Sequence, residues 1–405
     1  MSRTSVNLQR RAALIASPAF LLLVIEFFDE LAFGLREAAW PAIRTDLSLS
    51  YTQVGVLLAV PGIVSAVLEP PLALFGDTGR RKALIVTGGF LVAATLLLSA
   101  GAPGFLWLLV AFSALYPASG MFVSTSQAAL MEASPGDYDG AMARWTLAGS
   151  VGVVAGPLAL AGAFAAGLGW RWPLAAMGVV AGGLAFVAWR HLPRATASEE
   201  EAPTVAQLGG EFAAAVRRRE TWRWLSMLAM SDLMLDGLFG FLALYFVDVA
   251  GATTGQAGLA VATWTVFGLA GDAALVRLLK DVRGLVYLRV SAMAVFAVYP
   301  ALLLTPGFAW KLVPLAALGL LNAGWYAIPR ARFYASMPGR PGTNEAVSSA
   351  FGLFAGLIPV GLGLVAERWG LAAMMWLMLA GPIALLAGLP REGGEAVSVM
   401  TRDSE

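Results

Sequence analysis

The sequence predicts an all-α integral membrane protein with twelve transmembrane helices in two pseudo-symmetric six-helix bundles. Hydrophobic residues make up 59% of the chain and charged residues 13%, whereas soluble domains are about half apolar and about a quarter charged. The apolar residues form long continuous runs, which favour spanning helices over the short alternating strands of a membrane barrel. The second half of the chain also repeats the first half at a constant offset.

The apolar runs can be taken in order, because a helix of roughly 20 apolar residues crosses a bilayer. The first run follows Arg10 and Arg11 and resembles a secretion signal. It continues past signal length, carries Glu26 and Asp29, and shows no small-residue cleavage site, so we interpret it as a retained first span. Gly, Pro or charged residues separate the runs. We expect helices at 13–39, 51–75, 83–101, 105–131, 142–166, 171–189, 222–248, 256–279, 285–304, 310–334, 346–366 and 370–389.

The longest polar segment divides these helices into two sets of six. We expect an N-terminal bundle at 1–190, a cytoplasmic linker at 191–221, a C-terminal bundle at 222–390 and a cytoplasmic tail at 391–405. The positive-inside rule orients the chain with both termini in the cytoplasm. With that orientation, all of the 27 Lys and Arg residues lie on inner segments except Arg36, Arg44, Arg171, Lys311 and Arg368.

Sliding the chain against itself by 203 residues reveals the repeat. Asp29 then aligns with Asp232, Glu69 aligns with Asp272, and Gly149 aligns with another glycine, at 352. Two parallel six-helix repeats about an axis along the membrane normal are a transporter architecture, in which the substrate binds near mid-membrane between the halves.

The polar stretch between the second and third helices matches a known pattern. It contains Gly76, Asp77 and Gly79 followed by the basic run Arg80, Arg81 and Lys82, and with one residue of slippage its repeat contains Asp281 and Arg283. One interpretation is that the basic run only marks this loop as cytoplasmic. The stretch resembles the G-x3-D-R-x-G-R-R motif of the major facilitator superfamily, with one residue fewer between Asp and Gly and no cation directly after the Asp. The resemblance covers nearly the whole chain and implies that these residues form a gate.

The fifth helix carries a second resemblance to this family. Gly149, Gly152, Gly156 and Pro157 are similar to the family's G-x3-G-P antiporter motif, although the trailing glycine pair is absent. Glycines at this spacing make one smooth face, so close helix packing alone is an equally good interpretation. Residues 47–77 also resemble fosmidomycin-resistance-type efflux carriers, which favours efflux. The fourth helix lacks the Arg of many proton-coupled drug antiporters.

Helix 1 has a stripe of acids. Glu26, Asp29, Glu30 and Glu37 share one helical face with Phe33 and Trp40. Each acid at mid-membrane costs at least about 2.5–3.5 kcal/mol, so the stripe must line a cavity or contact other helices. Asp232 and Asp236 share a face of the seventh helix in the same way.

We expect these acids, with Glu69 and Asp272, to exchange protons or bind substrate. The alternative is that they are structural, either neutralised or paired with Arg36, Arg330 or Arg332; Glu37 near the outer end is expected to pair with Arg36. Pro70 and Pro71 after Glu69 predict a bend. We further expect the cavity to be lined by Phe33, Gln127, Asn322, Trp325, Tyr326 and Arg330.

Several function classes are excluded by composition. The chain has no Cys and one His, at 191, which excludes thiol chemistry, disulfides and a Cys/His metal site. It has no phosphate-binding Gly-Lys-Ser/Thr loop and no intramembrane protease motif, so we expect neither an ATP-driven pump nor an enzyme. A net charge of +1 gives no reason to expect nucleic-acid binding.

The sequence therefore predicts a secondary transporter of the cell (inner/plasma) membrane. We expect proton-coupled efflux, by antiport, of a small hydrophobic, cationic or neutral compound, driven by the proton gradient without a cofactor or metal. The expected partners are this substrate and the lipid bilayer, with the protein a monomer. The alternatives are a proton-coupled importer or uniporter of a sugar, nucleoside or other metabolite, and a receptor that does not transport.

Overall fold

Helices form all the regular structure in the described part of the chain. The computed structural model describes residues 18–75, 80–134, 137–193, 217–335, 347 and 351–390. The tail expected at 391–405 and most of the expected linker therefore lie outside the described residues. The first half contains α2 (Pro18–Asp46), α3 (Tyr51–Phe75), α4 (Arg81–Ala100), α5 (Phe105–Ser119), η2 (Gly120–Ser124), α6 (Thr125–Glu132), α7 (Tyr138–Ala165) and α8 (Arg171–His191).

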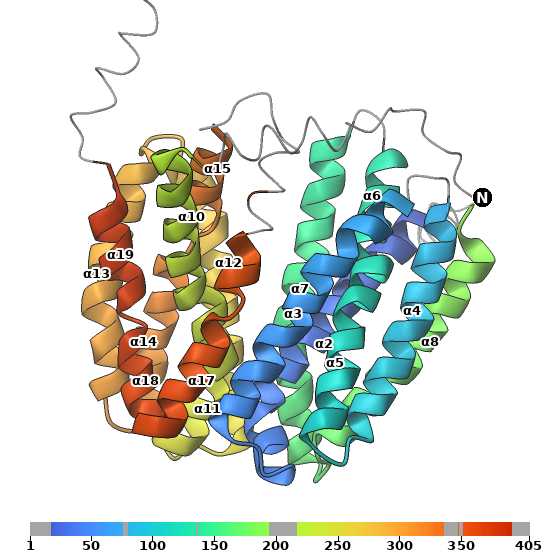
Figure 1. The fold of residues 1–405 in the computed structure, drawn as a ribbon, viewed down its shortest axis with the longest axis horizontal. Coiled ribbons are helices and arrows are strands. Elements are labelled where there is room, and N and C mark those ends of the chain that lie inside the picture. The colour runs from blue at the N-terminus through green and yellow to red at the C-terminus, as the bar shows by residue number, and fades with distance from the viewer. Residues whose placement is uncertain are drawn as a thin grey trace, which may run out of the picture.

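The second half has more interruptions. It contains α10 (Arg219–Asp232), η3 (Leu233–Gly237), α11 (Leu238–Leu244), η4 (Tyr245–Val249), α12 (Thr254–Leu278), α13 (Gly284–Leu304), α14 (Phe308–Leu321), α15 (Ala327–Ala335), α17 (Ile358–Trp369), α18 (Leu371–Leu377) and α19 (Ala380–Gly388). The two halves form two bundles side by side, the first drawn from blue to green and the second from yellow-green to red (Figure 1).

The described helices are consistent with twelve spans. Ten of them are long and apolar enough to cross a membrane, and α14 is a shorter apolar helix. Helix α2 has 29 residues and is long and apolar enough, but it carries more charged residues than the ten do. Ten spans together with α2 and the α14–α15 pair account for the twelve that the sequence predicts.

Several spans are less regular than the sequence predicts. The fourth span contains the π-helical turn η2, and the seventh contains η3 and η4. The tenth span, predicted as continuous over 310–334, breaks at residues 322–326, where Gly324 adopts φ +72°. Pro359 is the second residue of α17, in the first turn, where its missing N–H costs no helical hydrogen bond. Apolar periodicity is unchanged by one wide turn or a short break, so it could not reveal these features.

The helix-5 glycines lie in a tight seam between α7 and α2. A Cβ atom on Gly152 would meet the carbonyl oxygen of Phe27, and one on Gly156 would meet that of Leu31. Only glycine allows the two backbones to approach this closely. The expected smooth packing face is therefore present in the structure, whatever further role the motif has.

At one end of the molecule, polar contacts join the two bundles. Arg44 in α2 pairs with Asp248 in η4 (Nη1 to Oδ2, 3.0 Å), and the Tyr51 hydroxyl donates to the same oxygen at 2.9 Å. The Tyr51 backbone N–H also donates to Glu367 in α17 at 2.8 Å. We call this the closed end; it holds the loop 47–50 and lies at the bottom of Figure 1.

Candidate functional site

Three adjoining cavities lie in and between the bundles. The first, of about 390 Å³, lies among α2, α3, α4, α5 and η2. The second, of about 360 Å³, lies among α3, η3 and α17 and shares Gly62 and Ala66 with the first. The third, of about 340 Å³, shares Phe33 with the first and Asp236 with the second. The shared walls make them parts of one central cavity, in the place where this architecture predicts a substrate.

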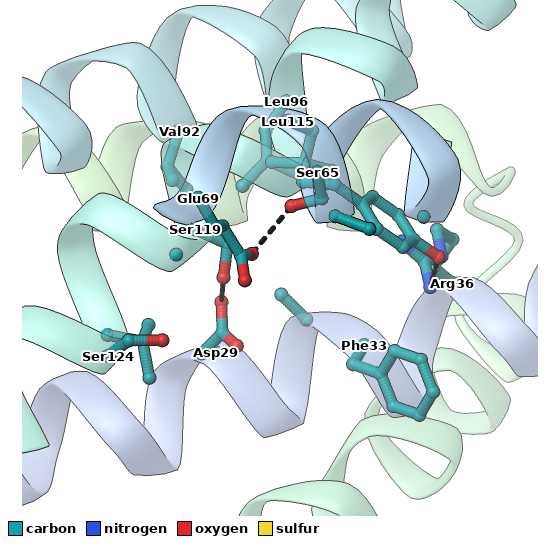
Figure 2. A pocket seen from close by; sticks show the side chains of 16 residues that line it. Asp29, Phe33, Arg36, Ser65, Glu69, Val92, Leu96, Leu115, Ser119 and Ser124 are labelled. Atoms are coloured by element: carbon teal, nitrogen blue, oxygen red, sulfur yellow. Dashed lines mark hydrogen bonds between the residues drawn. The ribbon is translucent and has the colours of Figure 1, made fainter. Parts of the chain in front are cut away.

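Two carboxyl groups of the first cavity lie close to the junction of α5 and η2, at Ser119 and Gly120. The Ser119 hydroxyl donates to Asp29 Oδ1 at 2.6 Å, and the Ser65 hydroxyl donates to Glu69 Oε1 at 2.6 Å. Figure 2 shows both carboxyl groups close to Ser119. A Cβ on Gly120 would lie 2.7 Å from Glu69 Oε1, so this glycine makes room for the carboxyl. The sequence pairs these acids with repeat partners, whereas the structure brings Asp29 and Glu69 together in one chamber.

A guanidinium group lines the same cavity. Arg36 is 5% exposed and donates to Glu37 Oε1 from Nε at 3.2 Å and from Nη2 at 2.8 Å. Nη2 also donates to the Tyr116 hydroxyl at 2.9 Å, and Trp40 Nε1 donates to Glu37 Oε2 at 2.9 Å. The predicted pairing of Glu37 with Arg36 is confirmed. Arg36 was not predicted to line the cavity, although its position two turns after Asp29 was an available signal.

The other predicted acids of α2 do not reach these cavities. Glu26 is 8% exposed, and its carboxyl lies against α7, where a Cβ on Gly149 would approach Oε1 to 2.6 Å. The Glu30 side chain also lies beside Gly149 and Gly152. Neither glutamate lines any of the three cavities. The acidic stripe is therefore divided, with Asp29 facing the cavity and its two neighbours facing the α2–α7 seam.

The second bundle contributes acids from two helices. Asp232 and Asp236 line the second cavity, and Asp236 and Asp272 line the third. The side chains of Asp236 and Asp272 are exposed. Arg330 interacts electrostatically with Asp232, as the structural alternative for this acid anticipated. Asp29 and Asp232 line different but adjoining cavities.

An aromatic stack joins the bundles beside these acids. The rings of Phe33 in α2 and Phe239 in α11 are 5.7 Å apart and inclined by 16°. Phe33 lines the first and third cavities, as the sequence predicts, and Phe239 lines the third. The stack supplies an apolar surface where the chambers meet.

Two residues predicted to line the cavity lie inside the second bundle instead. Trp325 is fully buried and donates from Nε1 to Ser291 Oγ at 3.0 Å. Asn322 is also buried and donates from Nδ2 to the Met234 carbonyl at 3.1 Å. The break at 322–326 changes the helical register, so a regular helix predicts the wrong direction for these side chains.

Three further predictions for the lining also differ from the structure. Tyr326 is exposed, and Gln127 lies beside Met142, with Nε2 3.7 Å from Sδ. Tyr326 and Gln127 line none of the three cavities. Arg330 also lies outside these cavities, and its charge interacts with Asp232 from there.

The predicted gate is only partly described. Gly76, Asp77 and Gly79 lie outside the described residues, Arg80 precedes α4, and Arg81 is its first residue. Lys82 donates from Nζ to the Leu192 carbonyl and so ties the start of α4 to the end of α8 within one bundle. In the second bundle, Asp281 and Arg283 lie in the loop between α12 and α13. The predicted gate role remains a prediction.

Known proteins resemble the chain in family and in fold. The sequence profile of the Major Facilitator Superfamily matches residues 22–344. No curated protein matches the chain significantly. A bacterial homologue of the human lysosomal transporter Spinster, inward-facing and unoccupied, has a TM-score of 0.69 at 16% identity, covering 93% of this chain and 94% of that chain. The nucleoside transporter NupG has a TM-score of 0.75 at 15% identity, covering 93% and 100%. At these identities the likeness shows the fold.

Proposed function

The chain belongs to the major facilitator superfamily and is a multi-pass membrane transporter, not an enzyme, and from this premise we propose that it exports a small hydrophobic, cationic or neutral compound in exchange for protons. The protein works as a monomer in the cell membrane, needs no cofactor, and has both termini in the cytoplasm. The asymmetric distribution of Lys and Arg supports this orientation.

The acidic central cavity is the observation that carries the proposal. Its lining includes carboxyl groups from both bundles, namely Asp29, Glu69, Asp232, Asp236 and Asp272. An ionised carboxylate beside apolar walls is costly unless a cation neutralises it. A proton and a cationic group of the substrate can each do this at the same carboxylate. Because they compete for it, release of one favours binding of the other, and this competition is the basis of antiport.

Asp29 is the group that we assign to the exchange. It lies on the cavity wall, and its Oδ1 is oriented by the Ser119 hydroxyl. Glu69 lines the same cavity, is exposed, and provides a second acceptor close by. Asp232 and Asp236 face the same space from the second bundle and complete the acidic surroundings of a bound cation.

Alternating access moves this cavity from one side of the membrane to the other. The Arg44–Asp248 ion pair and the Tyr51 contacts hold the closed end together. With the termini in the cytoplasm, the closed end faces outward, so the described conformation opens inward. Rocking of the two bundles about the central cavity breaks these contacts and opens the outer side. The stretch 76–82 serves as the inner latch of that opposite conformation.

A second candidate is proton-coupled import, or uniport, of a hydroxylated metabolite such as a sugar or nucleoside. The first cavity offers hydroxyl groups from Ser65, Ser119, Ser124 and Tyr116, which suit a substrate with several hydrogen-bonding groups. The same groups are compatible with efflux, and the number of carboxylates favours the cationic substrate.

The test uses purified protein in vesicles with a fluorescent pH reporter inside. Lipophilic cations, neutral antibiotics, sugars and nucleosides are added in turn, to wild type, Asp29→Asn and the control Asp137→Asn. Asp137 is a suitable control because it is an exposed surface acid paired with Arg144 at 3.0 Å. We expect a lipophilic cation to move protons in wild type and the control but not in Asp29→Asn. Proton movement that survives Asp29→Asn would remove this residue from the mechanism. Substrate equilibration without proton movement would reject antiport.

A further inference from the structure

Arg36 has no role in the function proposed above. A cation in the wall of an acidic cavity opposes binding of a simple cationic substrate, yet Arg36 lines the first cavity and is 5% exposed. Burial of an ion pair is costly, and its attraction often does no more than repay the desolvation. The partner, Glu37, is the next residue of the same helix, so this ion pair joins no two helices.

Hydrogen bonds to described residues hold the Arg36 guanidinium in place but involve only two of its three nitrogens. Nε and Nη2 make its three hydrogen bonds, to Glu37 and Tyr116. Among the described residues none bonds Nη1, and Nη1 is not among the enclosed polar atoms that lack a partner. In a residue that lines the cavity, this edge is therefore accessible from the cavity. The two N–H groups of Nη1 can donate charge-assisted hydrogen bonds to an anionic acceptor such as a carboxylate.

Aromatic rings surround the same group. The Arg36 Cζ atom lies 5.0 Å from the Phe33 centroid, 5.5 Å from that of Phe112 and 5.0 Å from that of Tyr116. The rings keep water away, which strengthens a hydrogen bond that a ligand makes to the guanidinium. Because Trp40 holds Glu37, the group is also oriented before the ligand arrives.

The opposite charge lies on the same wall. Asp29 is seven residues before Arg36 on α2, about 10 Å along the helix axis. Leu96 and Leu115 line the same chamber and form an apolar surface (Figure 2). The cavity thus presents an unused donor edge, an apolar wall and a carboxyl group within one chamber.

We propose that the transported molecule is a zwitterion whose anionic group binds Arg36 and whose amino group binds at Asp29. An apolar part separates the two charges and lies along Leu96 and Leu115. This inference rests on the proposed function and narrows its cationic or neutral substrate to a net-neutral one with two separated charges. Arg36 is then a specificity-determining residue, because it rejects a simple amine that leaves the guanidinium edge unoccupied.

Direct binding tests this without using proton coupling. Thermal unfolding of the full chain in detergent is measured with ω-amino carboxylates of increasing length, and with the alkylamine and alkanoate of each length. We expect at least one zwitterion to bind wild type about tenfold more tightly than its matched amine and alkanoate. Equal binding of amine and zwitterion at every length, or no binding by any zwitterion, would overturn the proposal.

Variants assign the preference to the guanidinium. Arg36→Gln should bind the zwitterion and the amine equally, with an affinity for the amine at least as high as in wild type, and Arg36→Lys should retain part of the preference. Tyr116→Phe tests the structural role, because it removes the bond from α5 but keeps the guanidinium. Since Tyr116 also lines the cavity, the readout is the ratio of zwitterion to amine affinity and not either affinity alone. If Arg36 only ties α2 to α5, Tyr116→Phe would lose the preference as Arg36→Gln does, and the proposal would be wrong. If Arg36→Gln does not fold, Arg36→Lys and the wild-type ligand series still show whether the protein prefers a zwitterion and whether the preference depends on the guanidinium.

The two proposals fail separately. Proton movement driven by a lipophilic cation, with no preference for zwitterions, would support antiport and overturn the zwitterion. A clear preference for a zwitterion, with no proton movement when that zwitterion is added to the vesicles, would support the role of Arg36 and reject proton coupling.

Discussion

Asp248→Asn should weaken the closed end and populate the conformation that is open there. In the structure Asp248 Oδ2 accepts from Arg44 Nη1 at 3.0 Å and from the Tyr51 hydroxyl at 2.9 Å. The donors belong to the first bundle and the acceptor to the second, so both bonds are lost when the bundles separate at this end. The amide keeps the shape of the side chain but removes its charge, so it weakens both bonds.

The size of the effect follows from exposure. The side chains of Arg44 and Asp248 are 26% and 21% exposed, so water screens the pair in part. A surface ion pair contributes about 0.2–1 kcal/mol, and a hydrogen bond to a charged group about 1.5–3 kcal/mol. After screening we expect a loss of about 1–2 kcal/mol, which changes the ratio of the two conformations by a factor of about 5–30. A conformation populated at about 1% would rise to about 5–25%.

Distance measurements between spin labels can detect this change. The chain contains no Cys, so Thr45→Cys and Val249→Cys place the two labels without any background. Thr45 and Val249 are exposed on opposite bundles at the closed end. Asp248→Asn should add a longer distance to the distribution, and Arg44→Gln should do the same, with a double variant little different from either single one. A distribution unchanged by both substitutions would refute the reasoning.

Three further predictions concern packing and the first cavity. Gly156→Leu should reduce the free energy of unfolding by about 1–3 kcal/mol or more, because a side chain there meets the α2 backbone. The yield of folded protein and the unfolding temperature should therefore fall, and unchanged thermal unfolding would contradict the α2–α7 seam. Gly120→Ala should displace the Glu69 carboxyl and slow transport in the vesicle assay with little change in unfolding temperature, and full transport would show that the position of Glu69 is unimportant. Trp325→Phe should cost about 1 kcal/mol in thermal unfolding through the lost bond to Ser291, without changing the affinity for substrate; altered affinity would return Trp325 to the cavity.

The fold class and the family follow from the sequence by itself. Apolar run length sets the number of spans, because the thickness of the bilayer sets the length of a helix that crosses it. The constant offset between the halves predicts two bundles, and the high cost of an acid in lipid predicts that Asp29, Asp232 and Asp236 face the interior. Residues 22–344 match the family that the loop and helix-5 motifs indicated.

Only the tertiary structure decided which interior surface each acid faces. A helical stripe is about 100° wide, and its two edges can face different neighbours. Asp29 therefore faces the cavity, while Glu26 lies against α7 one turn away. For Trp325 the cause is the break at 322–326, which changes the register of the tenth span without altering its hydropathy. Arg36 lines the cavity and donates to Tyr116 of α5, a contact between segments 80 residues apart. The direction of each of these side chains depends on which distant segment packs against its helix, and hydropathy periodicity along one helix does not carry that information.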